Sequence, residues 1–379
     1  MEPSNRAHAL LSSSSSSRWI HCTPSARLTE HIEDTPSNFA SEGTDAHSLC
    51  EYKLNKALGL KDEEAPKLDW YSQEMEDCAN GYASYVLEII EDLKAEGKEP
   101  LVLVEQRLDY SKYVEDGFGT GDAVIVADGV INVVDYKHGR GILVNAENNS
   151  QMMIYALGAL ELFDFIFDIE KVRMTIYQPR LGNVSTFEMT KKDLFKWADE
   201  VLVPASKLAF KGEGEFSCGE WCTFCKAKST CRERAKFNTN LAQKEFKEPP
   251  VLTDEEVVEV LLKIDGLVSW ANDVKEYAFQ EALKGKKWDG FKLVEGRSTR
   301  KYANEDEVAS VVEKAGFNPY EKKLVGITEL QKRMGKTKFL EIVEPYVIKP
   351  AGKPTLVLES DKRPEYNSAK LDFMTTEEN

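Results

Sequence analysis

The segment Gly121-Asp-Ala-Val-Ile-Val-Ala-Asp-Gly-Val-Ile-Asn-Val-Val-Asp-Tyr-Lys137 decides the fold, because its centre predicts a tight turn. Asp128-Gly129 separates two runs rich in β-branched residues, and this pattern is typical of a two-residue β-hairpin. If the residues that flank this pair face each other, Asp122 lies directly opposite Asp135, with Cβ atoms about 4.5–5.5 Å apart. The hairpin therefore predicts two neighbouring carboxylates at its open end.

A lysine follows the second acid. Lys137 lies two residues after Asp135 and so projects from the same face. That face also carries apolar residues that should be buried, namely Val124, Val126, Ile131 and Val133. Two close carboxylates at the end of an apolar face need a proton or a cation between them. We therefore expect Asp122, Asp135 and Lys137 to form a site for Mg²⁺ or Mn²⁺ and phosphate chemistry, not an ordinary surface ion pair.

Four further positions are weaker candidates. His47 is expected on a helix upstream of the strands, where an imidazole can complete a metal site made of oxygens. Gln151 and Tyr155 share one face of a later helix and could hold a phosphate or a base. Glu105 ends an apolar strand. Each has an ordinary alternative, as a surface histidine, a core tyrosine or a satisfied strand-end acid.

A cysteine cluster lies further along the chain. Cys222, Cys225 and Cys231 have the spacing C-x2-C-x5-C, and Cys218 comes just before them. Thiolates in such a cluster select Zn²⁺ or an iron–sulfur cluster. A fourth ligand is needed, for which Cys218 is the local candidate and Cys22 the distant one. From spacing alone, zinc with Cys218 is the simpler interpretation.

Composition limits the class of protein. The chain has 379 residues, 30% of them charged, and a formal net charge of −16. Nucleic-acid-binding proteins usually carry a basic surface, so this charge by itself argues against that class. A local basic groove or bound divalent cations would remove the objection. We find no apolar run of 18 residues, and hence expect no membrane span. The serine tract Ser12 to Ser17 is expected to be a flexible arm.

The order of predicted elements is helix, strands, helix, strands, helix. It indicates an α/β fold with a mixed central β-sheet flanked by helices. Lys247-Glu-Pro-Pro250 marks a boundary, after which a helix is expected over about 254–283. We expect an N-terminal arm over 1–40, a core domain over 41–245 and a C-terminal α+β extension over 250–379. In that extension, Gly296 to Lys301 is basic and could contact phosphates or be a solvated turn.

These motifs, taken in order, resemble the RecB-like branch of the PD-(D/E)XK nucleases. The matching residues are His47, Gly121-Asp122, Asp135-Tyr136-Lys137 and Gln151 to Tyr155, within about residues 18–235. The resemblance implies a restriction-endonuclease-like nuclease core. It also implies that His47, Asp122, Asp135 and the Tyr136 carbonyl hold Mg²⁺ or Mn²⁺, with Lys137 catalytic and with Gln151 and Tyr155 seating the strand.

A subset of these nucleases, the CRISPR-associated and AddB-type enzymes, also binds a [4Fe-4S] cluster. Carried over, its ligands are Cys22, Cys222, Cys225 and Cys231, and Cys218 is then spare. This favoured interpretation conflicts with a local zinc site. The cluster would join the N-terminal arm to the end of the nuclease domain.

The whole chain, including Asp361 to Pro364, is also similar to an uncharacterised family of phage and prophage proteins described as RecB-like nucleases. The expected function is a deoxyribonuclease, by analogy an exonuclease on DNA ends or single strands, in phage recombination or DNA processing. A recombinase or helicase is an expected partner, and the bacterial host cytoplasm is the expected location. The alternatives are a non-catalytic DNA-binding or recombination-accessory protein and a zinc-stabilised scaffold that binds proteins.

Overall fold

The computed structural model describes residues 9–33, 38–61, 64–244, 254–295, 302–320 and 324–348, together with 355, 357, 361 and 363. A five-stranded sheet in the order β1-β2-β3-β4-β5 forms the centre of the fold. Its strands are β1 (Leu101–Asp109), β2 (Phe118–Ala127), β3 (Gly129–Tyr136), β4 (Ile169–Gln178) and β5 (Asn183–Thr190). Only β3 and β4 pair in parallel, and α5 (Ser150–Phe163) connects them. The sheet is therefore mixed, as the sequence predicts.

The hairpin register agrees with the prediction. In the β2–β3 ladder Ala127 pairs with Val130 and Ala123 pairs with Val134, so Asp122 and Asp135 face each other one step beyond. Gly129 has a φ of +85°, a conformation that glycine adopts without steric cost. The turn fixes the register, and the register fixes which acids meet.

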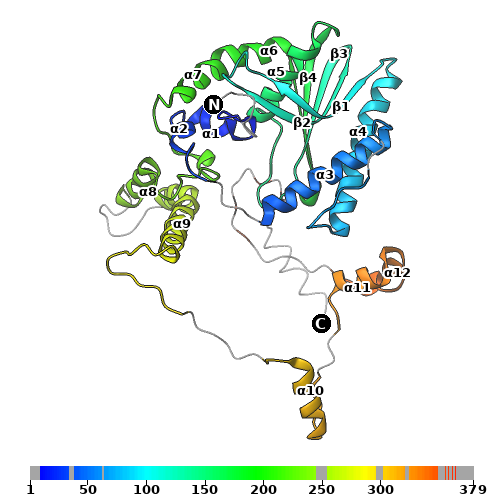
Figure 1. Cartoon of the computed structure of the whole chain (residues 1–379), viewed down its shortest axis with the longest axis vertical. Helices are drawn as coiled ribbons and strands as arrows, with labels where there is room; N and C mark the ends of the chain where they lie inside the picture. The colour runs from blue at the N-terminus through cyan, green and yellow to red at the C-terminus, as the bar shows by residue number, and fades with distance from the viewer. Residues whose placement is uncertain are drawn as a thin grey trace. The chain divides into compact units, whose positions relative to one another are not determined.

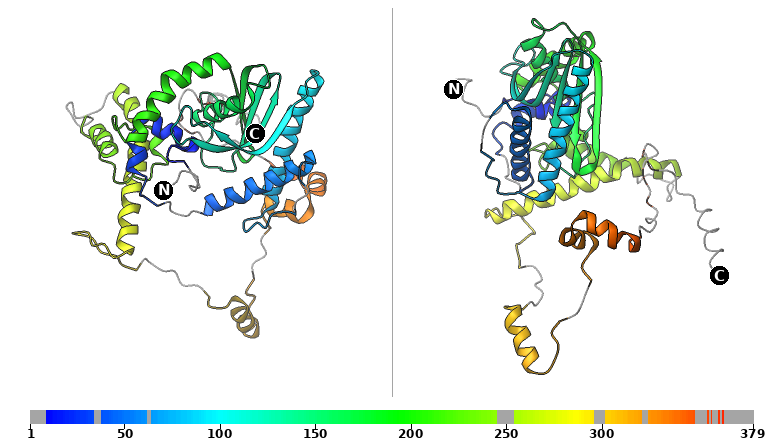
Figure 2. Two further views of the ribbon diagram at one scale, coloured as in Figure 1. Left: turned by 45° about the horizontal axis from the view of Figure 1, so that its top comes forward. Right: turned by 90° about the vertical axis from the view of Figure 1, so that its right-hand side faces the viewer.

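Two hydrophobic cores cover the two faces of the sheet (Figure 1). The face of α5 buries all four predicted positions, Val124, Val126, Ile131 and Val133. On the opposite face, α3 (Asn38–Leu58) and α4 (Gln73–Ala95) pack on the alternate residues of the same strands. Figure 2 shows these layers from two further directions. Because both faces are buried, β2 and β3 are largely apolar on both sides, with the buried Asn132 as a polar exception in the middle of β3.

The expectation of a flexible serine arm is wrong. Ser13–Ser15 form a 3-10 turn, and Ser16–His21 form helix α1, which packs against α5 and α7 (Val203–Lys211). Ser13 and Ser16 are buried, and Trp19 donates its indole N–H to the Ser12 carbonyl at 3.0 Å. The hydroxyls find partners in the folded core, so the segment is ordered despite its low complexity.

Some helix boundaries also differ from expectation. From the sequence, Thr44 is a plausible N-cap for a helix that runs to about Leu58, but α3 begins at Asn38, and the Thr44 hydroxyl donates to the Ala40 carbonyl within it. The later helix agrees, because α9 spans Asp254–Leu283. Beyond α6 (Lys191–Trp197), a π-helical turn over Ala198–Leu202 continues into α7. Sequence periodicity therefore predicted where the helices lie more accurately than the residue at which each begins.

By its internal contacts, the chain divides into two compact units, Met1–Leu293 and Val294–Asn379. The second unit has helices α10 (Glu305–Lys314), α11 (Ile327–Met334) and α12 (Lys336–Ile342). The described residues of the C-terminal extension contain helices and no strand, so its predicted β part finds no counterpart there. The segments 247–250 and 296–301 lie outside the described residues, as do residues 362 and 364. The domain boundaries expected at residues 40 and 250 stay predictions.

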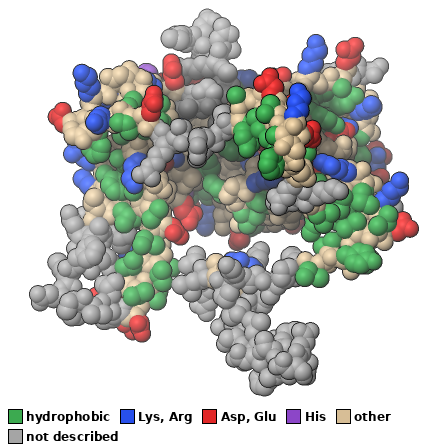
Figure 3. All heavy atoms as spheres, turned by 90° about the horizontal axis from the view of Figure 1, so that it is seen from below, with side chains coloured by type: hydrophobic (Ala, Val, Ile, Leu, Met, Phe, Trp, Pro, Cys, Tyr) green, Lys and Arg blue, Asp and Glu red, His purple; other side chains and the backbone are tan. Residues whose placement is uncertain are grey.

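Acidic and basic side chains are interspersed on the face of the molecule drawn in Figure 3, outside the atoms drawn in grey. Within the described part of the chain, no helix has both the length and the apolar character needed to cross a membrane.

Candidate active site

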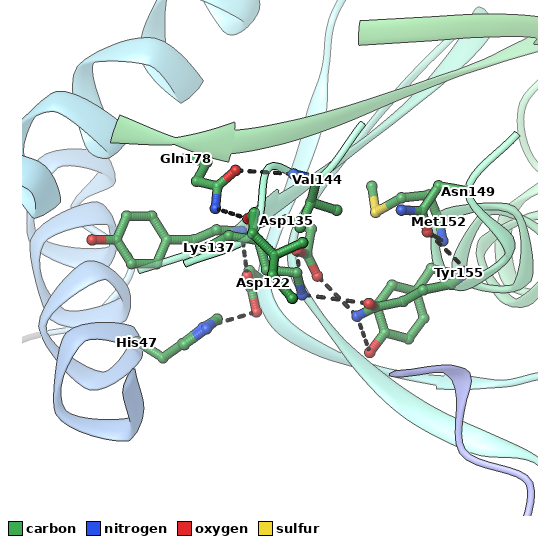
Figure 4. Close-up of polar contacts among 12 residues, drawn as sticks. His47, Asp122, Asp135, Lys137, Val144, Asn149, Met152, Tyr155 and Gln178 are labelled. Carbon is green, nitrogen blue, oxygen red and sulfur yellow. Dashed lines mark hydrogen bonds and ion pairs between the residues drawn. The ribbon is translucent and has the colours of Figure 1, made fainter. Parts of the chain in front are cut away.

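The candidate residues meet at the open end of the β2–β3 hairpin, between α3 and α5 (Figure 4). Asp122 comes from the first half of β2, Asp135 from the end of β3, and Lys137 directly follows that strand. His47 reaches Asp122 from α3, while Gln151 and Tyr155 belong to the first turns of α5. The structure therefore brings together residues from four elements.

Asp122 is held from two sides. Its Oδ1 lies 3.3 Å from His47 Nδ1, and its Oδ2 accepts a hydrogen bond from the Tyr136 backbone N–H at 2.7 Å. Burial alone would raise the pKa of Asp122, but the neighbouring His47 outweighs it and lowers this pKa below the usual value. Although burial opposes its charge, Asp122 raises the pKa of His47. The pair favours an ionised carboxylate beside an imidazole.

Glu105 completes this group, although it is only a weaker candidate from the sequence. The ligand atoms of His47, Glu105 and Asp122 all lie within 4.8 Å of one another. Glu105 has a φ of +51°, rare for a residue with a side chain, and it interrupts the β1–β2 ladder opposite Asp122. Burial and the charge of Asp122 raise its pKa to about 7. A strained backbone and a strongly shifted pKa at one residue are typical of functional sites.

Asp135 belongs to a second group of polar contacts. Its Oδ2 lies 2.8 Å from Lys137 Nζ, and its Oδ1 accepts from Gln151 Nε2 at 3.1 Å. Gln151 also contacts the Tyr155 hydroxyl and Lys137 Nζ, each at 3.4 Å. Burial raises the pKa of Asp135, as does the charge of Asp122, while Lys137 works in the opposite direction. The predicted Asp135, Lys137, Gln151 and Tyr155 therefore form one connected network.

The donor atoms of the first group fit a hard divalent cation. One imidazole nitrogen and two carboxylates converge, and oxygen with nitrogen donors is a set that Mg²⁺ or Mn²⁺ accepts. The raised pKa values of Glu105 and Asp135 show that the site, taken as protein alone, holds more negative charge than its surroundings stabilise. A bound cation would remove that excess. Asp135 lies outside the group within 4.8 Å, so its expected role as a ligand stays a prediction, as does that of the Tyr136 carbonyl.

Sequence reasoning missed two supports of the site. The buried Gln178 side chain donates to the Gly139 and Ile142 carbonyls at 3.0 and 2.8 Å and accepts from the Val144 N–H at 3.1 Å. It thereby fixes the loop that joins Lys137 to α5. Figure 4 shows Gln178 beside this loop. Its only sequence signal is an amide at the end of a predicted strand.

The second missed support is the serine tract. The Ser13 side chain lies near the Tyr155 hydroxyl and works against the rise that burial causes in the pKa of Tyr155. The Ser13 backbone N–H donates to the Tyr110 hydroxyl at 3.1 Å. Ser16 and Ser150 share a hydrogen bond of 2.7 Å between their hydroxyls, next to Gln151. The N-terminal segment therefore borders the Tyr155 side of the site. Low-complexity sequence carries no signal for such a place.

The cysteines form a separate site. One cavity is lined by Cys22, Cys222, Cys225 and Cys231, the four residues that the resemblance selects. The N-terminal segment is tied to this region, since Lys226 Nζ donates to the Ile32 carbonyl at 3.1 Å and His21 stacks on Trp221. Basic side chains, including Arg18 and Arg234, also line the cavity. The fold thus brings Cys22 to the distant cluster.

The two metal hypotheses differ in whether Cys218 or Cys22 is the fourth ligand. A zinc ion with thiolates at about 2.3 Å holds its sulfurs about 3.8 Å apart. Cys218 and Cys222 meet this, with sulfurs 4.0 Å apart, but among the described residues no three cysteine ligand atoms lie within 4.8 Å of one another. Cys218 does not line the cavity. The structure therefore places Cys22, and not Cys218, around one cavity with Cys222, Cys225 and Cys231.

The chain belongs to a family whose model, described as a protein of unknown function (DUF2800), matches residues 8–364. It is also similar to a solved structure titled "Crystal structure of SSO0001", with 13% identity over 57% of this chain and 96% of that chain. The TM-score of that match is 0.21, an overlap too small to establish a common fold.

Proposed function

We propose that this protein is a metal-dependent deoxyribonuclease of the RecB-like type, with an exonuclease activity on DNA ends or single strands. The observation that carries the proposal is the meeting of two groups at one end of the hairpin. His47, Glu105 and Asp122 can hold a cation, and the Asp135–Lys137 ion pair lies beside them. Hydrolysis of a phosphodiester needs both a cation and a positive side chain near the charge that develops.

The side chains have distinct roles in this proposal. Bound Mg²⁺ or Mn²⁺ would polarise the phosphate and lower the pKa of an attacking water. Although burial disfavours its charge, the neighbouring Asp135 raises the pKa of Lys137, so this lysine stays an ammonium that can stabilise negative charge. Asp135 orients Lys137, and Gln151 fixes Asp135 through its amide. Gln151 and Tyr155 then present neutral donors that can bind the strand.

A cleavage assay tests this proposal. DNA labelled at its 5′ or 3′ end, single-stranded or duplex, is incubated with the full chain and Mg²⁺ or Mn²⁺. We expect Asp135→Ala and Lys137→Ala to lower the rate by at least about 100-fold. Lys171→Ala is the matched control, since this exposed lysine pairs with Glu188 far along the sheet. Equal rates in all variants would exclude the site assignment. DNA binding without cleavage by the wild-type chain would favour the accessory-protein alternative.

We further propose that Cys22, Cys222, Cys225 and Cys231 hold a [4Fe-4S] cluster. The cavity that all four of these cysteines line, and that Cys218 does not, supports this choice of ligands. Anaerobically purified protein should be brown and contain iron and sulfide, and Cys22→Ser should lose the colour. Cys218→Ser is the matched control and should keep it. A colourless protein with stoichiometric zinc would refute the cluster and favour the scaffold alternative.

A further inference from the structure

A buried relay of side chains lies behind the candidate metal site. The Tyr136 hydroxyl lies 2.8 Å from His138 Nδ1, and His138 Nε2 lies 3.4 Å from Glu42 Oε1. Because a carboxylate accepts, Nε2 carries a proton toward Glu42, and Nδ1 of a neutral ring then accepts from the Tyr136 hydroxyl. Tyr136 is fully buried and His138 nearly so. The relay therefore has fixed partners at each step.

Both ends of the relay meet elements that carry the site. Glu42 belongs to α3, about one turn before His47. Arg180, which is largely buried, binds Glu42 at 2.9 Å and also reaches Glu74 of α4 at 3.2 Å. At the other end, the Tyr136 ring packs edge-on against the His47 ring, with centroids 5.5 Å apart. The relay therefore reaches His47 at both ends: through Glu42 on the same helix and through the Tyr136 ring that packs against the His47 ring.

We propose that His138 is a positioning residue of the metal site: through the Tyr136 hydroxyl it fixes the ring against which His47 packs, and so holds His47 toward Asp122. The inference rests on the proposed function only in taking His47 and Asp122 as ligands of a divalent cation. Groups behind metal ligands orient them, and their loss typically lowers metal affinity 10- to 100-fold. Tyr136 also donates its backbone N–H to Asp122, so one residue contacts both ligands.

Manganese affinity of the full-length chain tests this relay without any nuclease assay. Mn²⁺ binding is measured by titration calorimetry and electron paramagnetic resonance in the wild type, Tyr136→Phe, His138→Ala and the double variant. We expect each single variant to bind Mn²⁺ about tenfold more weakly. The double variant should bind no more weakly than Tyr136→Phe, because His138 acts only through the hydroxyl that this variant already lacks. His138→Asn, which keeps a polar group near the Nδ1 position, should restore much of the affinity.

Tyr82→Phe is the matched control. Tyr82 is buried against Tyr136, with ring centroids 5.4 Å apart, and its hydroxyl has no hydrogen-bond partner among the described residues. Removing that hydroxyl should leave Mn²⁺ affinity unchanged. The near-isosteric Tyr136→Phe keeps the test valid if His138→Ala does not fold.

The outcomes separate this inference from the proposed function. Wild-type affinity in Tyr136→Phe, or additive losses in the double variant, would overturn the positioning role. If the wild-type chain binds no Mn²⁺, both the positioning role and the metal site are overturned. A chain that shows the expected Mn²⁺ losses but cleaves no DNA would leave the relay established and refute the nuclease.

Discussion

At the residue scale, two features of Glu105 lower the stability of the folded chain at neutral pH. It combines a positive φ with a carboxyl group whose pKa burial and Asp122 raise to about 7. An unfolded glutamate ionises near 4.5, so the folded chain loses stability as the pH rises from about 4.5 to 7. Above that window the ionised side chain repels Asp122 unless a cation lies between them.

We therefore predict opposite effects of Glu105→Gln on stability and on metal binding. At pH 8 without metal, the variant should melt about 2–4 °C higher than the wild type, because the amide carries no charge. At pH 4 the difference should vanish. Mn²⁺ should raise the melting temperature of the wild type but not that of Glu105→Gln. Differential scanning calorimetry with and without Mn²⁺ measures both effects. Glu188→Gln, at an exposed ion pair, is the control. A variant that melts lower at pH 8 would contradict the charge argument.

At the scale of elements, helix α9 is joined to the cysteine region by charge. Asp273 of α9 pairs with Arg234 of α8 (Arg232–Lys244) at 2.6 Å and with Lys228 at 2.9 Å. Burial raises the pKa of Asp273, but these cations outweigh it, and the pKa lies below its usual value. Arg234 is almost fully buried, so loss of Asp273 would leave a buried cation poorly compensated.

We predict that Asp273→Asn loosens the packing of α9 on α8 at neutral pH. The lowered pKa means that the carboxylate stabilises the fold above about pH 3.8 and that this contribution is lost as the pH falls further. Amide hydrogen exchange should therefore quicken in α8 and α9 of the variant at pH 7, while the two proteins should become similar once the pH falls below the lowered pKa of Asp273. Asp306→Asn, in the other unit, is the control. Unchanged protection of α9 at pH 7 would show that apolar contacts alone hold it.

At the scale of the whole molecule, the N-terminal segment depends on the chain around residue 212. The Thr23 hydroxyl donates to the Glu213 carbonyl at 2.6 Å, and Arg27 Nε donates to the Phe210 carbonyl at 2.6 Å. Residues nearly 200 positions apart thus close the first compact unit, which ends at Leu293. The second unit has its own internal contacts.

We predict that a chain ending at Leu293 melts at the same temperature as the full chain and binds Mn²⁺ equally well. A chain ending at Gly212 should instead lose several degrees, because it removes the partners of Thr23 and the cysteine region. Calorimetry of the three chains provides the comparison. A Leu293 chain that unfolds more easily would show that the second unit stabilises the first.

Local sequence rules predicted the hairpin, its register and the order of helices and strands because turn chemistry and side-chain alternation act over a few residues. The network of Asp135, Lys137, Gln151 and Tyr155 followed from that register and from helical spacing. The roles of Glu105, Gln178 and Ser13 did not follow. A distorted strand residue, a buried amide and a serine tract acquire their partners only from elements distant in sequence.

The sequence by itself determined that two acids and a lysine share one end of a buried hairpin, because a tight turn and a period of two leave no other register. Only the tertiary structure decided which groups complete the site: it placed α3 so that His47 meets Asp122, distorted β1 so that Glu105 joins them, and folded the N-terminal segment so that Cys22 reaches the other cysteines. The physical reason is that long-range packing of helices on the sheet, unlike a turn, depends on the summed burial of many side chains across the whole core.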